Sequence, residues 1–197
     1  CKVIMNSRSK TKLKSASKKI PGSIPIAADL SCNKQAKNFI NSTKKYTKTI
    51  DILICNIGNS SSVAPGKENY KEWKKVFDSN FHTTTNIIEN SKKMIRKNSG
   101  SITCISSICG IEYIDGAPIT YSVAKSALNH YIKLSSKVFA KDGIRINGVA
   151  PGNILFENSV WQNKLKKDKK AVNSMLSKNV AMKRFGTIDE IADVVTF

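Results

Sequence analysis

The segment 101–125 constrains the fold of this chain more than any other stretch. Residues 102–105 have the apolar pattern of a short buried strand, and Ser106 and Ser107 stand where that strand would end. In an open α/β sheet, ligands bind at the ends of the strands. The following segment has a helical pattern, in which Tyr121 and Lys125 are one turn apart and share a face. The sequence therefore predicts an α/β fold with a serine, a tyrosine and a lysine near one strand end.

These three side chains suit proton transfer. A free phenol has a pKa near ~10 and exchanges protons poorly at neutral pH. An ammonium group one helical turn away favours the phenolate, so we expect Lys125 to lower the pKa of Tyr121. A serine hydroxyl at the strand end could hold a substrate oxygen at the same point. Taken alone, however, Tyr-x-x-x-Lys is also typical of an ordinary amphipathic helix.

In this context the chain resembles the short-chain dehydrogenase/reductase family, whose members carry a serine at a strand end and Tyr-x-x-x-Lys on the next helix. The spacing to Tyr121 favours Ser107 as the counterpart of the family's serine, and Ser106 stays open. The resemblance implies one doubly wound parallel α/β sheet of the Rossmann type across residues 1–197. Residues 155–183, which show no clear period, would form the variable substrate lid of that domain.

Two further motifs match the family. Asn80 corresponds to an asparagine that positions a water beside the catalytic lysine, although a helix-interior amide can instead bond a neighbouring backbone carbonyl. The turn 55–58, Cys-Asn-Ile-Gly, resembles the family's Asn-Asn-Ala-Gly with two departures. There Asn56 would bond adjacent strands, and Gly58 would permit close approach of the backbone to a cofactor.

The resemblance also implies where a nicotinamide cofactor binds. Ser7 stands where NAD-dependent members have an acid, and Arg8 follows it, which favours NADP(H) over NAD(H) because a basic residue pairs with the 2′-phosphate. Asp29 would lie near the adenine ring. It could equally belong to an ordinary helix start with Ser31 as the cap.

The nicotinamide end of the cofactor is implied by the Pro-Gly turn that follows the strand around 144–149. Pro151, Gly152 and Ile154 are the expected contacts there, and Phe156 replaces a threonine that is common in the family. Tyr121 and Lys125 would also contact the cofactor, with Lys125 holding the nicotinamide ribose.

The implied reaction is reversible hydride transfer between NADPH and a carbonyl, as in a 3-oxoacyl-thioester ketoreductase, with a secondary alcohol as the other partner. Ser107 would bind the oxygen, Tyr121 would deliver the proton, and Asn80 would order the water behind Lys125. A dehydrogenase of sugars or other small alcohols in the same family is an alternative. A non-catalytic relative that keeps the fold as a binding module is another.

Composition argues against other classes. The net charge of +19 could indicate a nucleic-acid-binding protein, but only Arg8, Arg96, Arg145 and Arg184 are arginine, and the lysines are spread along the whole chain. There is no long apolar run and no signal-peptide pattern, so we expect a cytoplasmic protein with no membrane partner. The five cysteines lack metal-binding spacing, and Cys55 and Cys104 are expected to be buried thiols.

Two expectations concern assembly. The family usually forms homodimers or homotetramers, and apolar side chains on the helices at 73–95 and 122–141, among them Phe77, Phe81 and Tyr131, indicate an interface there. No Gly-x-x-x-Gly-x-Gly turn precedes Asp29, and the chain stops at Phe197 within a helical pattern. We therefore expect a fragment, incomplete at both ends, that does not fold or bind cofactor as a full enzyme does. Its structure should show either a discontinuous sheet or a conformation taken from a longer parent chain.

Overall fold

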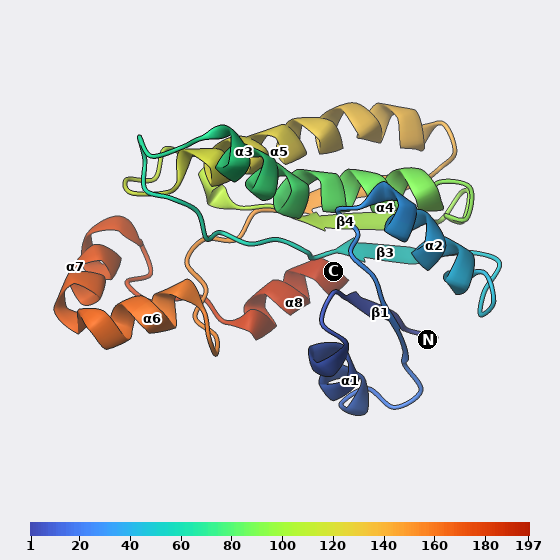
Figure 1. Cartoon of the computed structure of the whole chain (residues 1–197), viewed down its shortest axis with the longest axis horizontal. Coiled ribbons are helices and arrows are strands. Elements are labelled where there is room, and N and C mark those ends of the chain that lie inside the picture. Colours follow the sequence, from blue (N-terminus) through green and yellow to red (C-terminus); the bar gives the residue numbers. More distant parts are fainter.

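The computed structural model describes residues 1–197, which form alternating strands and helices (Figure 1). Every strand pair is parallel, so the predicted α/β class is confirmed. The strands are β1 (Ile4–Ser7), β2 (Ile24–Ala27), β3 (Ile52–Cys55), β4 (Ser101–Ile105) and β5 (Arg145–Val149). The α-helices are α1 (Lys10–Lys18), α2 (Asn33–Thr43), α3 (Tyr70–Phe77), α4 (Thr83–Ser91), α5 (Ile119–Ala140), α6 (Val160–Lys167), α7 (Lys169–Asn179) and α8 (Ile188–Thr196).

The sheet is divided into two parts. One part pairs β1 with β2, and the other has the order β3-β4-β5. The prediction of a discontinuous sheet is therefore confirmed. Within the larger part, Cys104 lies opposite Cys55 on one side and Gly148 on the other. This register brings the carboxyl ends of the three strands to one edge, where functional side chains of parallel sheets gather.

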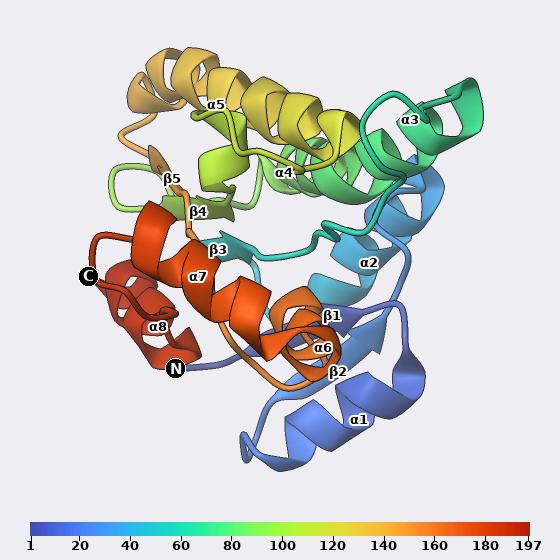
Figure 2. The ribbon, with the colours of Figure 1, turned by 90° about the vertical axis from the view of Figure 1, so that its left-hand side faces the viewer.

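Helices α3, α4 and α5 cover one face of the β3-β4-β5 sheet (Figure 2). The core between them contains apolar side chains from both layers, such as Ile88, Ile102 and Leu128, and also the buried thiols of Cys55 and Cys104, as predicted. Alternate residues of β3 point to the other face. There Ile52 and Ile54 are 67% and 50% exposed, so β3 is packed on one side only.

The long helix predicted around residues 73–88 is interrupted. Between α3 and α4, residues Asp78–His82 form a π-helical turn, η1, with Asn80 at its centre. A π turn holds one residue more than an α-helical turn and is frequent at functional sites. The amphipathic pattern predicted the helix but not the extra residue that aims Asn80 inward.

Residues 155–183 contain two helices that the sequence pattern did not resolve. Ser159 caps α6 by accepting a hydrogen bond from the Gln162 backbone, and Asp168 caps α7 in the same way through Ala171. Both helices lie to one side of the sheet (Figure 1) and bury few side chains. No helix in the molecule is both long enough and apolar enough to span a membrane.

Candidate active site

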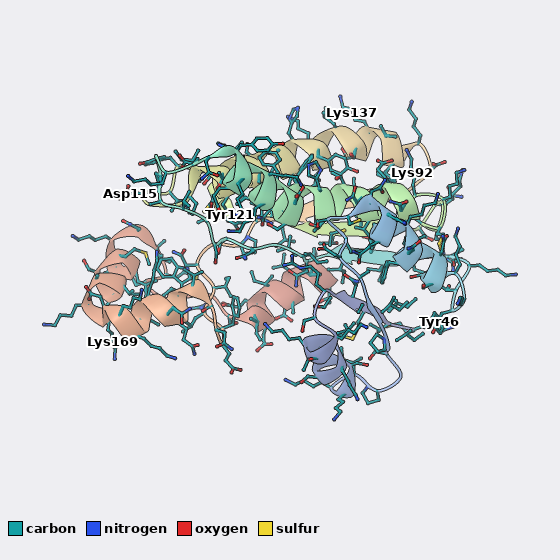
Figure 3. All side chains as sticks on the ribbon, in the orientation of Figure 1. Tyr46, Lys92, Asp115, Tyr121, Lys137 and Lys169 are labelled. Atoms are coloured by element: carbon teal, nitrogen blue, oxygen red, sulfur yellow. The ribbon has the colours of Figure 1, made fainter.

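The candidate site lies where β4 and β5 end and α5 begins. After β4, Ser107 starts the short 3-10 turn η2 (Ile108–Gly110) and accepts a hydrogen bond at its Oγ from the backbone of Cys109, 3.2 Å away. The backbone N–H of Ile108 donates to the carbonyl oxygen of Pro151 at 3.1 Å. This bond ties the loops after β4 and β5 together. Figure 3 shows Tyr121 on the side of the molecule nearer helices α6 and α7, with Tyr46 at the opposite end.

The two adjacent serines have different surroundings. Ser106 is buried, and its Oγ donates to the carbonyl oxygen of Lys125 at 3.4 Å, so it braces the backbone of α5. Ser107 instead lies beside the Tyr121 phenol and interacts with it. This geometry favours Ser107 as the serine of the site.

Lys125 is a buried cation. Its side chain is 3% exposed, its Nζ donates to the carbonyl oxygen of Ile105 at 2.9 Å, and Nζ lies 5.8 Å from the centre of the Tyr121 ring. Burial lowers the pKa of Lys125 to about 8. The ammonium form therefore still predominates at neutral pH. Buried cations with perturbed pKa values cluster at functional sites.

Tyr121 holds its proton more tightly than the sequence predicts. Burial raises the pKa of Tyr121, the nearby Ser107 hydroxyl lowers it, Cys109 raises it, and the net direction is upward. The expected lowering of this pKa by Lys125 is therefore wrong for this structure. The physical reason is that burial penalises the phenolate, while the Lys125 ammonium is turned toward the Ile105 carbonyl.

Asn80 is fully buried and clamps a neighbouring turn. Its Nδ2 donates to the carbonyl oxygens of Val76 at 3.0 Å and Asn59 at 2.9 Å, and its Oδ1 accepts from the Asn59 backbone N–H at 3.0 Å. The bond to Val76 is the helix-interior contact named above as the alternative. The two bonds to Asn59 go further, because they fix the backbone after β3 at the site. A role in ordering water stays a prediction.

Gly58 lies where Asn80 and Lys125 meet. A Cβ atom at this position would lie 2.9 Å from Asn80 Oδ1 and 3.2 Å from Lys125 Nζ. Only glycine leaves these two groups in place. Asn56, two residues earlier, is exposed and makes no side-chain hydrogen bond, so its expected bonding to adjacent strands is not present.

Two supporting contacts were missed by sequence reasoning. Gly110 packs on the backbone of α5, where an added Cβ would lie 2.6 Å from the carbonyl carbon of Lys125. The Oγ of Ser62 lies 2.7 Å from Oγ1 of the buried Thr120, which joins the loop after β3 to the start of α5. The glycine shortly after Ser107 was a visible signal for the first contact. Nothing local indicated the second.

The predicted adenosine contacts form a separate group beside β1 and β2. Arg8 lines a cavity of about 300 Å³ that also includes Asn59, so the cavity reaches the turn held by Asn80. Burial raises the pKa of Asp29, but hydrogen bonds from Ser31 and the nearby Arg8 outweigh it and lower this pKa. Ser31 is not the cap of α2, because that position belongs to Cys32 and Ser31 bonds Asp29 instead.

The predicted nicotinamide contacts lie next to Ser107 through Ile108. Pro151 accepts the backbone bond described above, and a Cβ at Gly152 would contact the Ile108 side chain at 3.7 Å. Ile154 pairs with Gly186 in an isolated parallel bridge, which joins the two ends of the segment that contains α6 and α7. These groups and the close approach at Gly58 fit a dinucleotide laid across the strand ends. The chain offers no glycine-rich turn for the pyrophosphate, since Gly22 is the only glycine before Asp29.

Comparison with known proteins finds relatives that match most or all of the chain. A family model described as enoyl-(acyl carrier protein) reductase matches residues 1–197. The 3-oxoacyl-[acyl-carrier-protein] reductase FabG of Rickettsia prowazekii is 31% identical over 199 residues, covering 100% of this chain and 78% of the relative. The enzyme of that name from Staphylococcus epidermidis is 28% identical over 176 residues, covering 89% of this chain and 69% of its own length.

Solved structures show the same fold. ElxO with NADP bound superposes with a TM-score of 0.88 at 26% identity, covering 99% of this chain and 79% of its own. NAD⁺-bound xylitol dehydrogenase superposes with a TM-score of 0.89 at 21% identity, covering 98% of this chain and 80% of its own. The second likeness bears on the fold alone.

Proposed function

Since the chain belongs to the short-chain dehydrogenase/reductase family of NAD(P)-dependent oxidoreductases, we propose that it reduces the ketone of a 3-oxoacyl thioester with NADPH. One observation carries the chemistry. Burial raises the pKa of Tyr121 and keeps its phenol protonated, the Ser107 hydroxyl lies beside it, and the Lys125 ammonium lies 5.8 Å from the centre of its ring. A protonated phenol is the form needed to protonate an oxygen as a ketone is reduced.

Each side chain has one task in this reaction. Bound NADPH supplies the hydride. Ser107 donates a hydrogen bond to the ketone oxygen, while its own oxygen accepts one from the Cys109 backbone. Tyr121 gives its proton to the same oxygen as the alcohol forms. Lys125, whose ammonium lies 5.8 Å from the centre of the Tyr121 ring, would favour the phenolate formed during the reaction by its opposite charge, although burial keeps the resting phenol protonated.

After the reaction, Tyr121 would regain its proton through the Lys125 ammonium and a water on the far side of Lys125. The Lys125 Nζ has three protons and one protein acceptor, Ile105, so protons remain for the nicotinamide ribose and for a water. Asn80 holds the turn at Gly58 that borders this space and would position that water. In the proposal, Asn80 is a positioning residue.

NADPH is favoured over NADH by Arg8. Its guanidinium lines the polar cavity beside β1, where it would pair with the 2′-phosphate. If NADPH binds as in the family, Asp29 would lie near its adenine, Asn56 and Gly58 would contact it, and Pro151, Gly152 and Ile154 would border its nicotinamide. The similar protein ElxO holds NADP in its solved structure, which supports this choice.

The substrate class is supported by the relatives and by the surface near the site. The Rickettsia and Staphylococcus proteins are both named for 3-oxoacyl groups on acyl carrier protein. Ile111 and Tyr113, which follow η2, and Phe156, which follows the β5 turn, are exposed apolar side chains. Such a surface suits an acyl chain better than a polyol. The segment 155–183 would close over the substrate as a lid.

We also propose a homodimer or homotetramer assembled through the helical layer. Phe77 at the end of α3, Phe81 in η1 and Tyr131 in α5 form a chain of half-buried aromatic contacts, with successive ring centres 6.0 and 6.1 Å apart. Leu134 and Val138 continue this apolar surface along α5 and are more than half exposed. A second copy would cover it.

A substrate panel tests the proposed activity. The intact protein is mixed with NADPH and a 3-oxoacyl thioester, a ketohexose or a simple ketone, and the loss of NADPH absorbance is followed. Turnover should be fastest with the thioester and should fall to background in Tyr121→Phe. A preference for the sugar would replace the substrate proposal with the polyol alternative, and no turnover with any carbonyl would leave a binding module.

A further inference from the structure

The cavity beside Arg8 contains a second cation that no motif pointed to. Helix α3 carries three lysines, Lys71, Lys74 and Lys75, and only Lys75 lines this space of about 300 Å³. Its lining is otherwise mostly polar, consisting of Arg8, Asp78, Asn59 and three serines around one apolar residue, Val76. The cavity therefore brings together one cation that follows β1 and another from α3.

The charges around this cavity are arranged to leave it positive. The one acid in its lining, Asp78, is bound by Lys74 at 2.6 Å and so is already neutralised. Lys75 is held by Glu72, 3.2 Å away on the preceding turn, whose own side chain is largely buried and does not line the cavity. Arg8 takes part in no ion pair. Arg8 is thus the unpaired cation of the lining, and Lys75 could exchange Glu72 for a bound anion, so the cavity favours an anionic ligand.

We infer that Lys75 is a second specificity-determining residue, which binds the 2′-phosphate of the cofactor together with Arg8. The inference rests on the proposed use of NADP(H). It adds Lys75 on α3 to Arg8, which follows β1, as a residue that sets the preference for NADP(H). Arg8 offers a planar fork of donors, and Lys75 offers an ammonium on a flexible side chain. The serines and Asn59 supply neutral hydrogen bonds between them.

Binding of fragments tests this without turnover. Affinities of the full chain for 2′,5′-ADP and 5′-AMP are measured by calorimetry, because the two differ only in the 2′-phosphate. Lys75→Met should weaken 2′,5′-ADP binding by about five-fold, as expected for a half-exposed charge pair, and leave 5′-AMP nearly unchanged. Raising the salt concentration should shrink the difference from wild type, since salt screens this interaction.

Lys71→Met is the matched control. Lys71 lies one turn earlier on α3, is exposed and does not line the cavity, so its removal changes the net charge equally. It should leave both affinities at the wild-type value, and Lys75→Arg should retain most of the 2′,5′-ADP affinity. An equal loss in Lys71→Met and Lys75→Met, or an equal loss for both ligands, would overturn the assignment.

The outcomes distinguish the role of Lys75 from the proposed NADP(H) preference on which it rests. If wild type binds 2′,5′-ADP and 5′-AMP equally, the NADP(H) preference fails and the role of Lys75 fails with it. If wild type discriminates and Arg8→Met removes the discrimination while Lys75→Met does not, the cofactor choice stands and only the role of Lys75 is overturned. Loss of discrimination in both variants supports both cations.

Discussion

The Nζ of Lys125 donates a hydrogen bond to the carbonyl oxygen of Ile105, 2.9 Å away, and joins helix α5 to the end of strand β4. The bond holds the ammonium group of Lys125, the proposed catalytic lysine, at the end of β4 and away from the phenol of Tyr121, which lies one helical turn earlier. Because the same side chain is buried and carries a charge, it must cost stability while serving the site. Structure and proposed chemistry therefore make opposing demands on one residue.

Replacing Lys125 by Met is expected to stabilise the fold and abolish turnover. The pKa of Lys125 is depressed from 10.5 to about 8, so between these values the unfolded chain binds a proton that the folded chain does not. The penalty grows as pH falls from 10.5 to 8 and is constant below, with an upper bound of about 3 kcal/mol. The lost bond to Ile105 offsets about 1 kcal/mol of the gain.

Thermal unfolding measured across this pH range checks the Lys125 prediction. The advantage of Lys125→Met over wild type should be largest below pH 8 and should fade toward pH 10.5. The exposed Lys133→Met on the same helix should show no such dependence. A variant less stable than wild type at pH 7 would contradict the assigned burial cost.

Tyr121→Phe should lose most turnover with little change in folding. The ring and its packing remain, and only the proton is removed. General acid catalysis typically contributes ~10²-fold or more, so the rate of ketone reduction should fall by at least that factor. Cofactor affinity, measured by fluorescence, should stay near the wild-type value. Retention of more than about a tenth of the rate would exclude Tyr121 as the proton donor.

Arg8→Asp should reverse the cofactor preference. A charge-assisted bond to the 2′-phosphate becomes a like-charge repulsion, so the affinity for NADP(H) should drop strongly and that for NAD(H) should change little. Equilibrium titration with both cofactors measures the two effects in parallel. Equal losses would mean that Arg8 supports the loop and does not select the cofactor.

Gly110→Ala should damage both stability and turnover. The new Cβ would meet the backbone of α5 at Lys125, which cannot move as a flexible side chain would, and such overpacking typically costs about 1–3 kcal/mol. The turn η2 must shift, and Ser107 shifts with it. A lower melting temperature together with a lower kcat is expected, and wild-type values of both would show that the contact is not tight.

Leu134→Glu should weaken self-association. A charge placed on the exposed apolar surface of α5 would have to be buried against a second copy. Light scattering at micromolar concentration should report a dimer or tetramer for wild type and a smaller species for the variant. Lys169→Glu, on α7 and far from α5 in Figure 3, is the control and should leave the mass unchanged. A monomeric wild type would refute the interface.

The features predicted well from sequence are those that depend on neighbours along the chain. Tyr121 and Lys125 lie on one helix, and Ser107 ends one strand, so their alignment follows from spacing and period alone. Strands β4 and β5 were predicted to within a few residues for the same reason. Short-range pattern and parallel topology together were enough to gather the site.

The features that escaped prediction depend on contacts across the fold. The direction of the Tyr121 pKa is set by burial, which the sequence does not report. The π turn around Asn80 is favoured by its bonds to Asn59, which lies on another segment. In the same way, Lys71 and Lys75 share one face of α3, so the helical period alone could not show that only Lys75 lines the cavity.

The one-sided packing of β3 has a consequence for solubility. β3 pairs with β4 along one edge only, its sequence Ile-Leu-Ile-Cys carries no charge, and its outer face presents Ile52 and Ile54 to solvent. Proteins usually protect a free strand edge with lysine, proline or a bulge, and none interrupts these four residues. The many lysines elsewhere on the surface keep the molecules apart by charge repulsion. Salt, which screens that repulsion, should therefore promote strand-to-strand aggregation at β3.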